Sequence, residues 1–361
     1  MFFMLCVVFH LIINKNYASA QSCKSFNNVN MLLYDRIGQK FYQDINGCVT
    51  RTVFGNTTVV KAFTKDQIIP KLGKDSIRHM KYLTMVSFRN CNVEEIEQTA
   101  FRNVPSLATV EISFGKLRAV PKGVFNFDLT PQLEAVKLDH NRINFIEDES
   151  FFNISSLKNV QLNNNLLERW RSEWFQNSTA LEVINLAFNN LKEIPSRAFT
   201  SFTSLKDIRL DHNDISKVQR DAFKGVRTLD YLGLSHNKLT SLSDSSFPNT
   251  LRINYFRINA NYLTFLSNDV LKKLAAVEIS MNYNPWTCPC LERINYWLYI
   301  KNGRIKSDDK CSRSHIPVCV VPNNTETCTD EFDREAMLKY VNIIKTINMS
   351  DPVSANCMTF K

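Results

Sequence analysis

A repeat of fixed length is the feature that most constrains how this 361-residue chain can fold. From Leu133 onward, apolar residues recur every 24 residues at the first, fourth, sixth, eleventh, fourteenth and nineteenth places of each unit. Such a period is typical of a solenoid, in which each unit packs against its neighbours. The ninth place is asparagine in every unit through the last one: Asn141, Asn165, Asn189, Asn213, Asn237, Asn261 and Asn284.

Each unit predicts a strand, a turn and a return segment. Alternating apolar residues in the first half of the unit predict a short strand with one face inward. The asparagine follows this strand, where the turning chain buries backbone N–H and C=O groups. An amide side chain carries both donors and an acceptor, so a ladder of asparagines can bridge those groups between turns.

These residues resemble the extracellular leucine-rich repeat family (L-x-x-L-x-L-x-x-N-x-L) in its 24-residue form with a late phenylalanine. The resemblance implies an α/β fold, a curved solenoid of about ten repeats with a parallel concave sheet and disulfide-bonded caps. Degenerate units beginning at Val59, Leu83 and Leu107 extend the array toward the N-terminus. The second of them carries Cys91 at the ninth place, which we interpret as a small buried thiol.

The ends of the chain predict secretion. Residues 1–20 are expected to be a signal peptide, because an apolar stretch precedes the small residues Ala18-Ser19-Ala20. A membrane anchor is the alternative, but the stretch is too short to span a bilayer. The predicted organisation is an N-terminal cap over 21–58, repeats over 59–283, a cysteine-rich C-terminal cap over 284–328, and a helix and tail over 329–361.

Cysteines cluster at both ends of the array, and an oxidising secretory route favours disulfides there. Cys23 and Cys48 are expected to pair within the N-terminal cap. The run N-P-W-x-C-x-C from Asn284 resembles the start of the family's C-terminal cap. That resemblance implies two disulfides, Cys288–Cys311 and Cys290–Cys328.

Cys319 and Cys357 are two cysteines more than the four of the family's cap pattern. They can pair with each other or exchange roles with Cys328, and Cys357 can instead bond another chain. A helix is expected directly after Cys290. An amphipathic helix is expected over 330–347, docked either on the cap or on a partner.

The predicted binding surface is the concave sheet. Sequons suited to a secreted glycoprotein occur at Asn56, Asn153, Asn177, Asn323 and Asn348. Two of them share the twenty-first place, on the convex side, so sugars there would leave the concave face free. That face is expected to present the third, fifth, seventh and eighth places. A polar surface with a few aromatic anchors suits protein recognition, although a solvated scaffold face would also be polar. The candidate binding residues are Lys137, Asp139, Gln161, Asn163, Asn185, Phe188, Arg209, Asp211, Tyr231, Tyr255 and Arg257.

Other functional classes find no support in the sequence. It lacks the H-E-x-x-H, G-x-S-x-G and phosphate-loop motifs, which predicts no enzyme and no cofactor. His140, His212 and His236 share the eighth place, but no third ligand is evident, so no metal site is predicted. The net charge of +9 comes without interleaved aromatics or a known module, so nucleic acid is not an expected partner.

In its signal peptide, solenoid and C-terminal cap, the chain resembles soluble arthropod immune proteins such as the mosquito leucine-rich repeat immune family. Many members of that family carry a coiled coil after the cysteine-rich region, so this chain would resemble a member that lacks it. This resemblance implies an innate immune role, an extracellular protein or glycan ligand such as a complement-like or receptor protein, and possible dimerisation. The alternative is a matrix or cell-surface adhesion protein, akin to small leucine-rich proteoglycans or receptor ectodomains such as Toll. The proteoglycans' four-cysteine N-terminal cluster and a receptor's membrane span are both missing.

Overall fold

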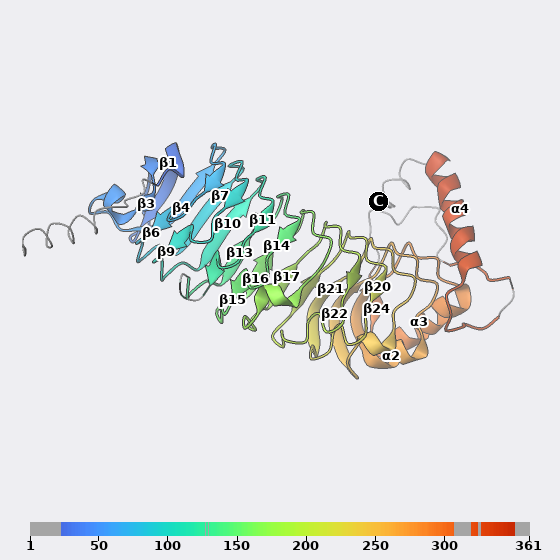
Figure 1. Ribbon diagram of the computed structural model, residues 1–361. Coiled ribbons are helices and arrows are strands. Elements are labelled where there is room, and N and C mark those ends of the chain that lie inside the picture. Colours follow the sequence, from blue (N-terminus) through green and yellow to red (C-terminus); the bar gives the residue numbers. More distant parts are fainter. Residues whose placement is uncertain (1–22, 127, 129, 307–318, 324–325, 351–361) are drawn as a thin grey trace, which may run out of the picture.

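A computed structural model describes residues 23–126, 128, 130–306, 319–323 and 326–350, with side chains through residue 346. They form an elongated, curved solenoid whose concave side is one 13-stranded sheet (Figure 1). The predicted fold class, a leucine-rich repeat solenoid with a parallel sheet, is therefore confirmed. The signal peptide expected over 1–20 lies outside the described residues, as do Cys311 and Cys357.

The strands of the concave sheet, in spatial order, are β2 (Lys40–Gly47), β1 (Phe26–Asp35), β4 (Val59–Lys65), β7 (Met85–Arg89), β10 (Thr109–Ser113), β13 (Ala135–Lys137), β16 (Asn159–Gln161), β17 (Val183–Asn185), β19 (Asp207–Arg209), β21 (Thr228–Gly233), β22 (Leu251–Arg257), β23 (Leu274–Ser280) and β24 (Arg304–Ile305). Pairs involving β1 are antiparallel, and those from β4 to β24 are parallel.

Short strands and helices return the chain on the other sides of the solenoid. The strands are β3 (Val49–Thr50), β5 (Lys71–Leu72), β6 (Ile77–Arg78), β8 (Glu95–Ile96), β9 (Phe101–Arg102), β11 (Ala119–Val120), β12 (Phe125–Asn126), β14 (Phe145–Ile146), β15 (Phe151–Phe152), β18 (Glu193–Ile194) and β20 (Lys217–Val218). The helices are η1 (Arg51–Phe54), η2 (Ser172–Phe175), η3 (Asp244–Ser246), α2 (Asn268–Lys273), α3 (Cys288–Ile300) and α4 (Arg334–Ser350).

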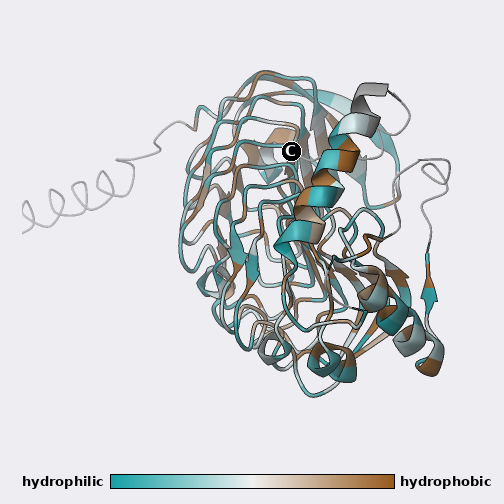
Figure 2. Cartoon of the chain, turned by 90° about the vertical axis from the view of Figure 1, so that its right-hand side faces the viewer, coloured by the Kyte–Doolittle hydropathy of each residue, from teal (hydrophilic) through white to brown (hydrophobic). Residues whose placement is uncertain are grey.

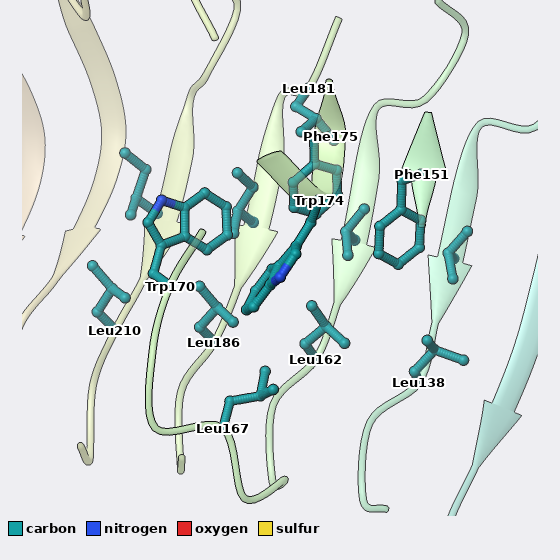
Figure 3. Packing of buried hydrophobic residues seen from close by; sticks show 14 of the residues in the cluster. Leu138, Phe151, Leu162, Leu167, Trp170, Trp174, Phe175, Leu181, Leu186 and Leu210 are labelled. Carbon is teal, nitrogen blue, oxygen red and sulfur yellow. The ribbon is translucent and has the colours of Figure 1, made fainter. Parts of the chain in front are cut away.

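Equivalent places of successive repeats pair with one another. Val136 lies opposite Val160, which lies opposite Ile184, so fourth-place side chains stack in a row inside the solenoid. Sixth-place leucines form a second buried row, seen in Figure 3 as Leu138, Leu162, Leu186 and Leu210. This shared register turns the 24-residue period of the sequence into one continuous apolar core.

Aromatic rings close the core opposite the sheet. The nineteenth-place rings of Phe125, Phe151 and Phe175 stack with centroids 5.6 and 4.8 Å apart. Trp170 bridges to the next repeat, because its ring lies 5.7 Å from Phe175 and 5.4 Å from Phe199 (Figure 3). Its indole N–H donates to the Ala198 carbonyl at 3.0 Å, so the ring is satisfied although only 4% exposed.

The ninth-place asparagines connect each repeat to the one before it. Nδ2 of Asn189 donates to the carbonyls of Leu162 and Leu186 at 3.0 and 3.1 Å, and Oδ1 accepts from the Leu167 N–H at 3.0 Å. The same three contacts recur at the other six positions. Each asparagine therefore satisfies buried backbone groups of two repeats.

Two ninth places lack the amide. Cys91 is fully buried there, and its thiol contacts the Thr64 carbonyl of the preceding repeat at 3.4 Å. At Gly115, a Cβ added to the backbone would lie 2.7 Å from Oδ1 of Asn141. The neighbouring amide therefore needs the space that a side chain at Gly115 would fill.

Two of the expected disulfides form, and one expected pair is wrong. Cys23 bonds Cys48 and Cys290 bonds Cys328. Cys288 bonds Cys319, so the expected Cys288–Cys311 pair is wrong.

Backbone hydrogen bonds explain this pairing of Cys288. Its N–H donates to the Val320 carbonyl at 2.9 Å, and the Val320 N–H donates to the Trp286 carbonyl at 2.8 Å. These bonds hold Cys319 beside Cys288, a juxtaposition that the family spacing does not reveal.

The C-terminal helix α4 docks on the cap. Its residues Ala336, Tyr340 and Ile344 are buried with Val320, and Tyr283 of the last repeat packs against them. Asp333 caps the helix by accepting from the Ala336 N–H at 2.8 Å. Figure 2 shows polar and apolar residues alternating along α4, as expected for an amphipathic helix. No helix among the described residues is long and apolar enough to span a membrane.

Replacing Asn189 by Ala removes the hydrogen bonds that this side chain forms with four buried backbone groups. We expect Asn189→Ala to lower the free energy of unfolding by about 1–3 kcal/mol. Asn190→Ala is the matched control, because that side chain lies outside the ladder. Urea unfolding of both variants measures the effect, and equal stability of the two would contradict the ladder's role.

The thiol of Cys91 is expected to be unreactive in the folded protein. Burial raises the pKa of Cys91, which lowers the thiolate fraction at neutral pH, and the side chain is inaccessible. Alkylation followed by mass spectrometry should leave Cys91 unmodified under native conditions and label it in denaturant. Labelling at equal rates in both conditions would contradict the burial.

Candidate binding site on the concave sheet

Five of the sequence-predicted residues gather near the C-terminal end of the concave sheet. The pairing of β19, β21, β22 and β23 aligns their third places in one row and their fifth places in another. β24 adds a further strand beside β23. We call the resulting group the C-terminal cluster: Asp207, Arg209, Asp211, Tyr231, Tyr255, Arg257, Glu278, Arg304 and Lys306.

A buried carboxylate organises the cluster. Asp211 is 4% exposed and accepts from the backbone N–H and the hydroxyl of Ser235 and from the Tyr231 hydroxyl, the last at 3.1 Å. Nη1 of Arg257 donates to the Tyr231 hydroxyl oxygen at 3.2 Å and lies 3.9 Å from Asp211. Burial and the charge of Asp211 raise the pKa of Tyr231. The phenol therefore stays protonated and keeps donating to the carboxylate.

Gly233 makes this arrangement possible. It occupies the fifth place between Arg209 and Arg257, and a Cβ there would lie 1.9 Å from Oδ2 of Asp211. The Asp211 carboxylate thus fills the volume that a side chain would take. The sequence places Gly233 in the concave row but does not reveal this steric requirement.

Cations and aromatic rings form the exposed part of the cluster. Arg209 donates to Asp207 through Nε at 2.9 Å and Nη2 at 2.8 Å, and its guanidinium lies 5.0 Å from the Tyr231 ring centre. Lys306 lies 4.4 Å from the Tyr255 ring centre. The two tyrosine rings meet edge to face at 5.6 Å. These contacts fix side chains that are enriched in protein-binding hot spots.

A buried donor and a buried acceptor near the end of β22 have no hydrogen-bond partner among the described residues. Nε of Arg257 and Oδ1 of Asn259 are buried and form no hydrogen bond within the described part of the chain. Asn259 as a whole is 7% exposed. The two residues occupy the fifth and seventh places of one repeat.

Sequence reasoning missed four cluster members, Asp207, Glu278, Arg304 and Lys306. Arg304 forms an ion pair with Glu278 and lies on β24, after the cap helix. Lys306 approaches the same carboxylate at 3.5 Å. β24 stands outside the repeat pattern, so the periodicity gives no signal that it extends the sheet.

The other predicted residues lie apart from this cluster. Nδ2 of Asn185 donates to Gln161 at 2.8 Å and to Asn163 at 3.1 Å, forming a strip of amides in the middle of the sheet. Asp139 accepts from the Ser113 hydroxyl at 2.8 Å. Lys137, on β13, is half-buried. The predicted residues thus share the concave side without forming a single site.

Phe188 belongs to a separate row formed by the eighth places. Its φ of 55° and those of His212 and His236 lie in the left-handed region, where His is enriched. Phe188 is 40% exposed and stacks on His212 at 4.1 Å, and His212 stacks on His236 at 4.0 Å. Parallel rings do not direct their nitrogens to a common point. Within the part that the structure describes, no group of three His, Cys, Asp or Glu residues could hold a metal.

A second concave surface lies at the N-terminal end and was not predicted. We call it the N-terminal patch: Leu32, Tyr34, Tyr42 and Phe63. Leu32 pairs with Tyr42 on one side and Phe63 on the other, and Tyr34 meets Phe63 edge to face at 5.6 Å. Tyr42 is 68% exposed. Leu32, Tyr34 and Tyr42 lie on the antiparallel hairpin of β1 and β2, outside the 24-residue repeat, so the periodicity does not reveal that they meet Phe63 on β4.

Comparison with protein families identifies the repeats. A BspA type leucine rich repeat region of six copies matches residues 48–168 and 123–254, and a leucine rich repeat model matches 227–285. The chain belongs to the leucine-rich repeat family. Both matches describe repeats rather than a catalytic domain. Among curated proteins, a sequence search finds no match.

Solved structures share the fold at low sequence identity. A chain of the Drosophila Toll–Spätzle complex is 19% identical with a TM-score of 0.55, and the match covers 69% of this protein and 38% of that chain. A chain of the mouse RP105/MD-1 complex is 21% identical with a TM-score of 0.57, covering 68% and 42%. Human 5T4 is 17% identical with a TM-score of 0.50, covering 77% and 91%. This leucine-rich repeat protein therefore spans less than half of the first two chains.

A side chain at Gly233 should disrupt the C-terminal cluster. We expect Gly233→Ala to displace the buried Asp211 carboxylate and lower the free energy of unfolding by about 1–3 kcal/mol. Gly73→Ala is a suitable control, because a Cβ there meets only ordinary contacts of 3.4 Å or longer. Denaturant unfolding measures both variants. An unchanged midpoint for Gly233→Ala would show that Asp211 relocates without loss.

Proposed function

We propose that this protein is a secreted, non-enzymatic recognition protein that binds an extracellular protein through the concave sheet, chiefly through the C-terminal cluster. The observation that carries the proposal is the pair of tyrosines, Tyr231 and Tyr255, each covered by a cation held in an ion pair. Aromatic and arginine side chains supply most of the binding energy in protein interfaces.

The fixed geometry of the cluster favours binding. Side chains already held by hydrogen bonds lose little conformational freedom when a partner arrives. The cluster also carries charges of both signs, on Arg209 and Lys306 and on Asp207 and Glu278. A protein partner therefore fits this surface better than an apolar small molecule.

Secretion and glycosylation remain parts of the proposal. The three disulfides suit an oxidising compartment. Asn56, Asn153, Asn177 and Asn323 are all exposed, so these sequons are accessible in the fold. The side chain of Asn348 lies outside the described residues.

An innate immune role rests on the resemblance to arthropod immune proteins and on a shared fold. The Toll–Spätzle complex is described as a hub in Drosophila development and innate immunity. A complement-like protein or a receptor is the partner that this role implies. Infection-induced secretion into body fluid would support it.

Adhesion in matrix or at a cell surface is the second candidate. The separation of the C-terminal cluster from the N-terminal patch favours it, because two surfaces at opposite ends of one sheet can contact two partners. Steady retention in tissue matrix, without induction by infection, would support adhesion over immunity.

Charge reversal in the cluster tests the proposed surface. We expect Arg209→Glu to reduce partner binding at least about tenfold, because it removes the cation over Tyr231 and places two acids together. Stability should change little, since Arg209 is exposed and an ion pair at the surface contributes little to stability. Lys217→Glu, on β20 of an outer sheet, is the control.

The assay uses immobilised wild-type and variant proteins incubated with extracellular fluid. Retained proteins are identified by mass spectrometry, and purified candidates are then titrated against each variant. Loss of binding by Arg209→Glu but not by Lys217→Glu supports the concave site. Equal retention by all three proteins would refute it.

A further inference from the structure

The two edges of the concave sheet differ in how they are protected. The C-terminal edge strand, β24, has only two residues. The N-terminal edge strand, β2, has eight residues, contains no proline, and pairs with β1 in continuous register from Lys40 to Ile45. A long exposed strand edge presents unpaired backbone N–H and C=O groups that can accept another strand. The described residues place no strand there.

Side chains along β2 alternate between the exposed concave face and the opposite face, which is turned toward the core. Lys40, Tyr42 and Asp44 are exposed, whereas Phe41 and Gln43 between them are half-buried. Lys40 forms no ion pair with any residue that the structure describes. Asp44 accepts from Asn30 through Oδ1 at 2.7 Å, which leaves its second oxygen for another donor.

We propose that β2 pairs antiparallel with β2 of a second copy of this chain, with Tyr42 at the two-fold axis. With Tyr42 on the axis, residues two positions before it lie opposite residues two positions after it in the other copy. Lys40 of each copy therefore lies opposite Asp44 of the other, which gives two such pairs. Opposite charges facing across strands stabilise the pair. The two tyrosines then meet at the centre.

Other arrangements of the same two strands lose this match. Parallel pairing in register places lysine beside lysine and aspartate beside aspartate, which is unfavourable. An axis moved to Phe41 or Gln43 places a charged residue opposite Tyr42. Charge complementarity therefore selects one register.

The N-terminal patch makes the paired edge continuous. Leu32 and Phe63 lie beside Tyr42 on consecutive strands, so pairing joins the two patches into one strip of apolar and aromatic side chains. The hairpin is already ordered, because Oδ1 of Asp35 accepts from the N–H groups of Ile37 and Gln39 at 3.0 and 2.8 Å. Pairing thus requires little rearrangement within each copy.

Sedimentation equilibrium of the full secreted chain tests the proposal. Lys40→Asp and Asp44→Lys should each weaken self-association at least about tenfold, because each creates like-charge pairs twice. The double variant Lys40→Asp with Asp44→Lys exchanges the charges and should restore dimerisation. Lys74→Asp, an exposed lysine away from this edge, should dimerise like the wild type.

Restoration by the double variant also shows that the single variants fail through charge rather than through misfolding. Circular dichroism checks the fold of the single variants. A non-reducing gel distinguishes disulfide-linked dimers from the proposed non-covalent dimer. A wild-type protein that stays monomeric up to about 100 μM would overturn the proposal. Equal dimerisation of all variants would overturn it too, as would occupation of the β2 edge by another segment of this chain or by another protein's strand.

Discussion

The amide of each ninth-place asparagine links two repeats, and the rest of the solenoid depends on that link. A turn that follows a buried strand leaves backbone groups without water, and an unsatisfied group there is costly. One asparagine supplies two donors and one acceptor at the required place. Because the backbone groups of the turn are hydrogen-bonded, successive repeats keep the same register. The fourth-place side chains then stack in one row and the sixth-place side chains in another. Register, core and concave surface all follow from that alignment.

The sequence predicts most of this scaffold, because the scaffold repeats. A residue such as Leu162 has the same neighbours as Leu186, so the pattern of one unit predicts the contacts of the next. The prediction is weaker where the pattern stops. The Cys288–Cys319 disulfide depends on a backbone contact between Trp286 and Val320, which are distant in sequence. The N-terminal patch depends on antiparallel pairing, which a parallel repeat does not foreshadow.

The concave surface shows the same division. Its rows can be read from the period, so the positions of Arg209, Tyr231 and Arg257 on one face are predictable. Which of these side chains contact one another is not predictable, because that depends on Gly233 leaving room for the Asp211 carboxylate and on the position of Lys306, which belongs to the C-terminal cap. The sequence predicts which side chains share the concave face, and the three-dimensional contacts show which of them form the C-terminal cluster.

Because the strands are evenly spaced, the number of repeats sets the distance between the two ends of the concave sheet. Nine strand-to-strand steps separate β2 from β21, which at about 4.8 Å each amounts to roughly 40 Å. A molecule that touches both ends of the concave face must span that length. Inserting or deleting one repeat would change the length by a single step and leave each end intact. Selection on repeat number could therefore tune the size of what fits between the ends without altering either contact surface.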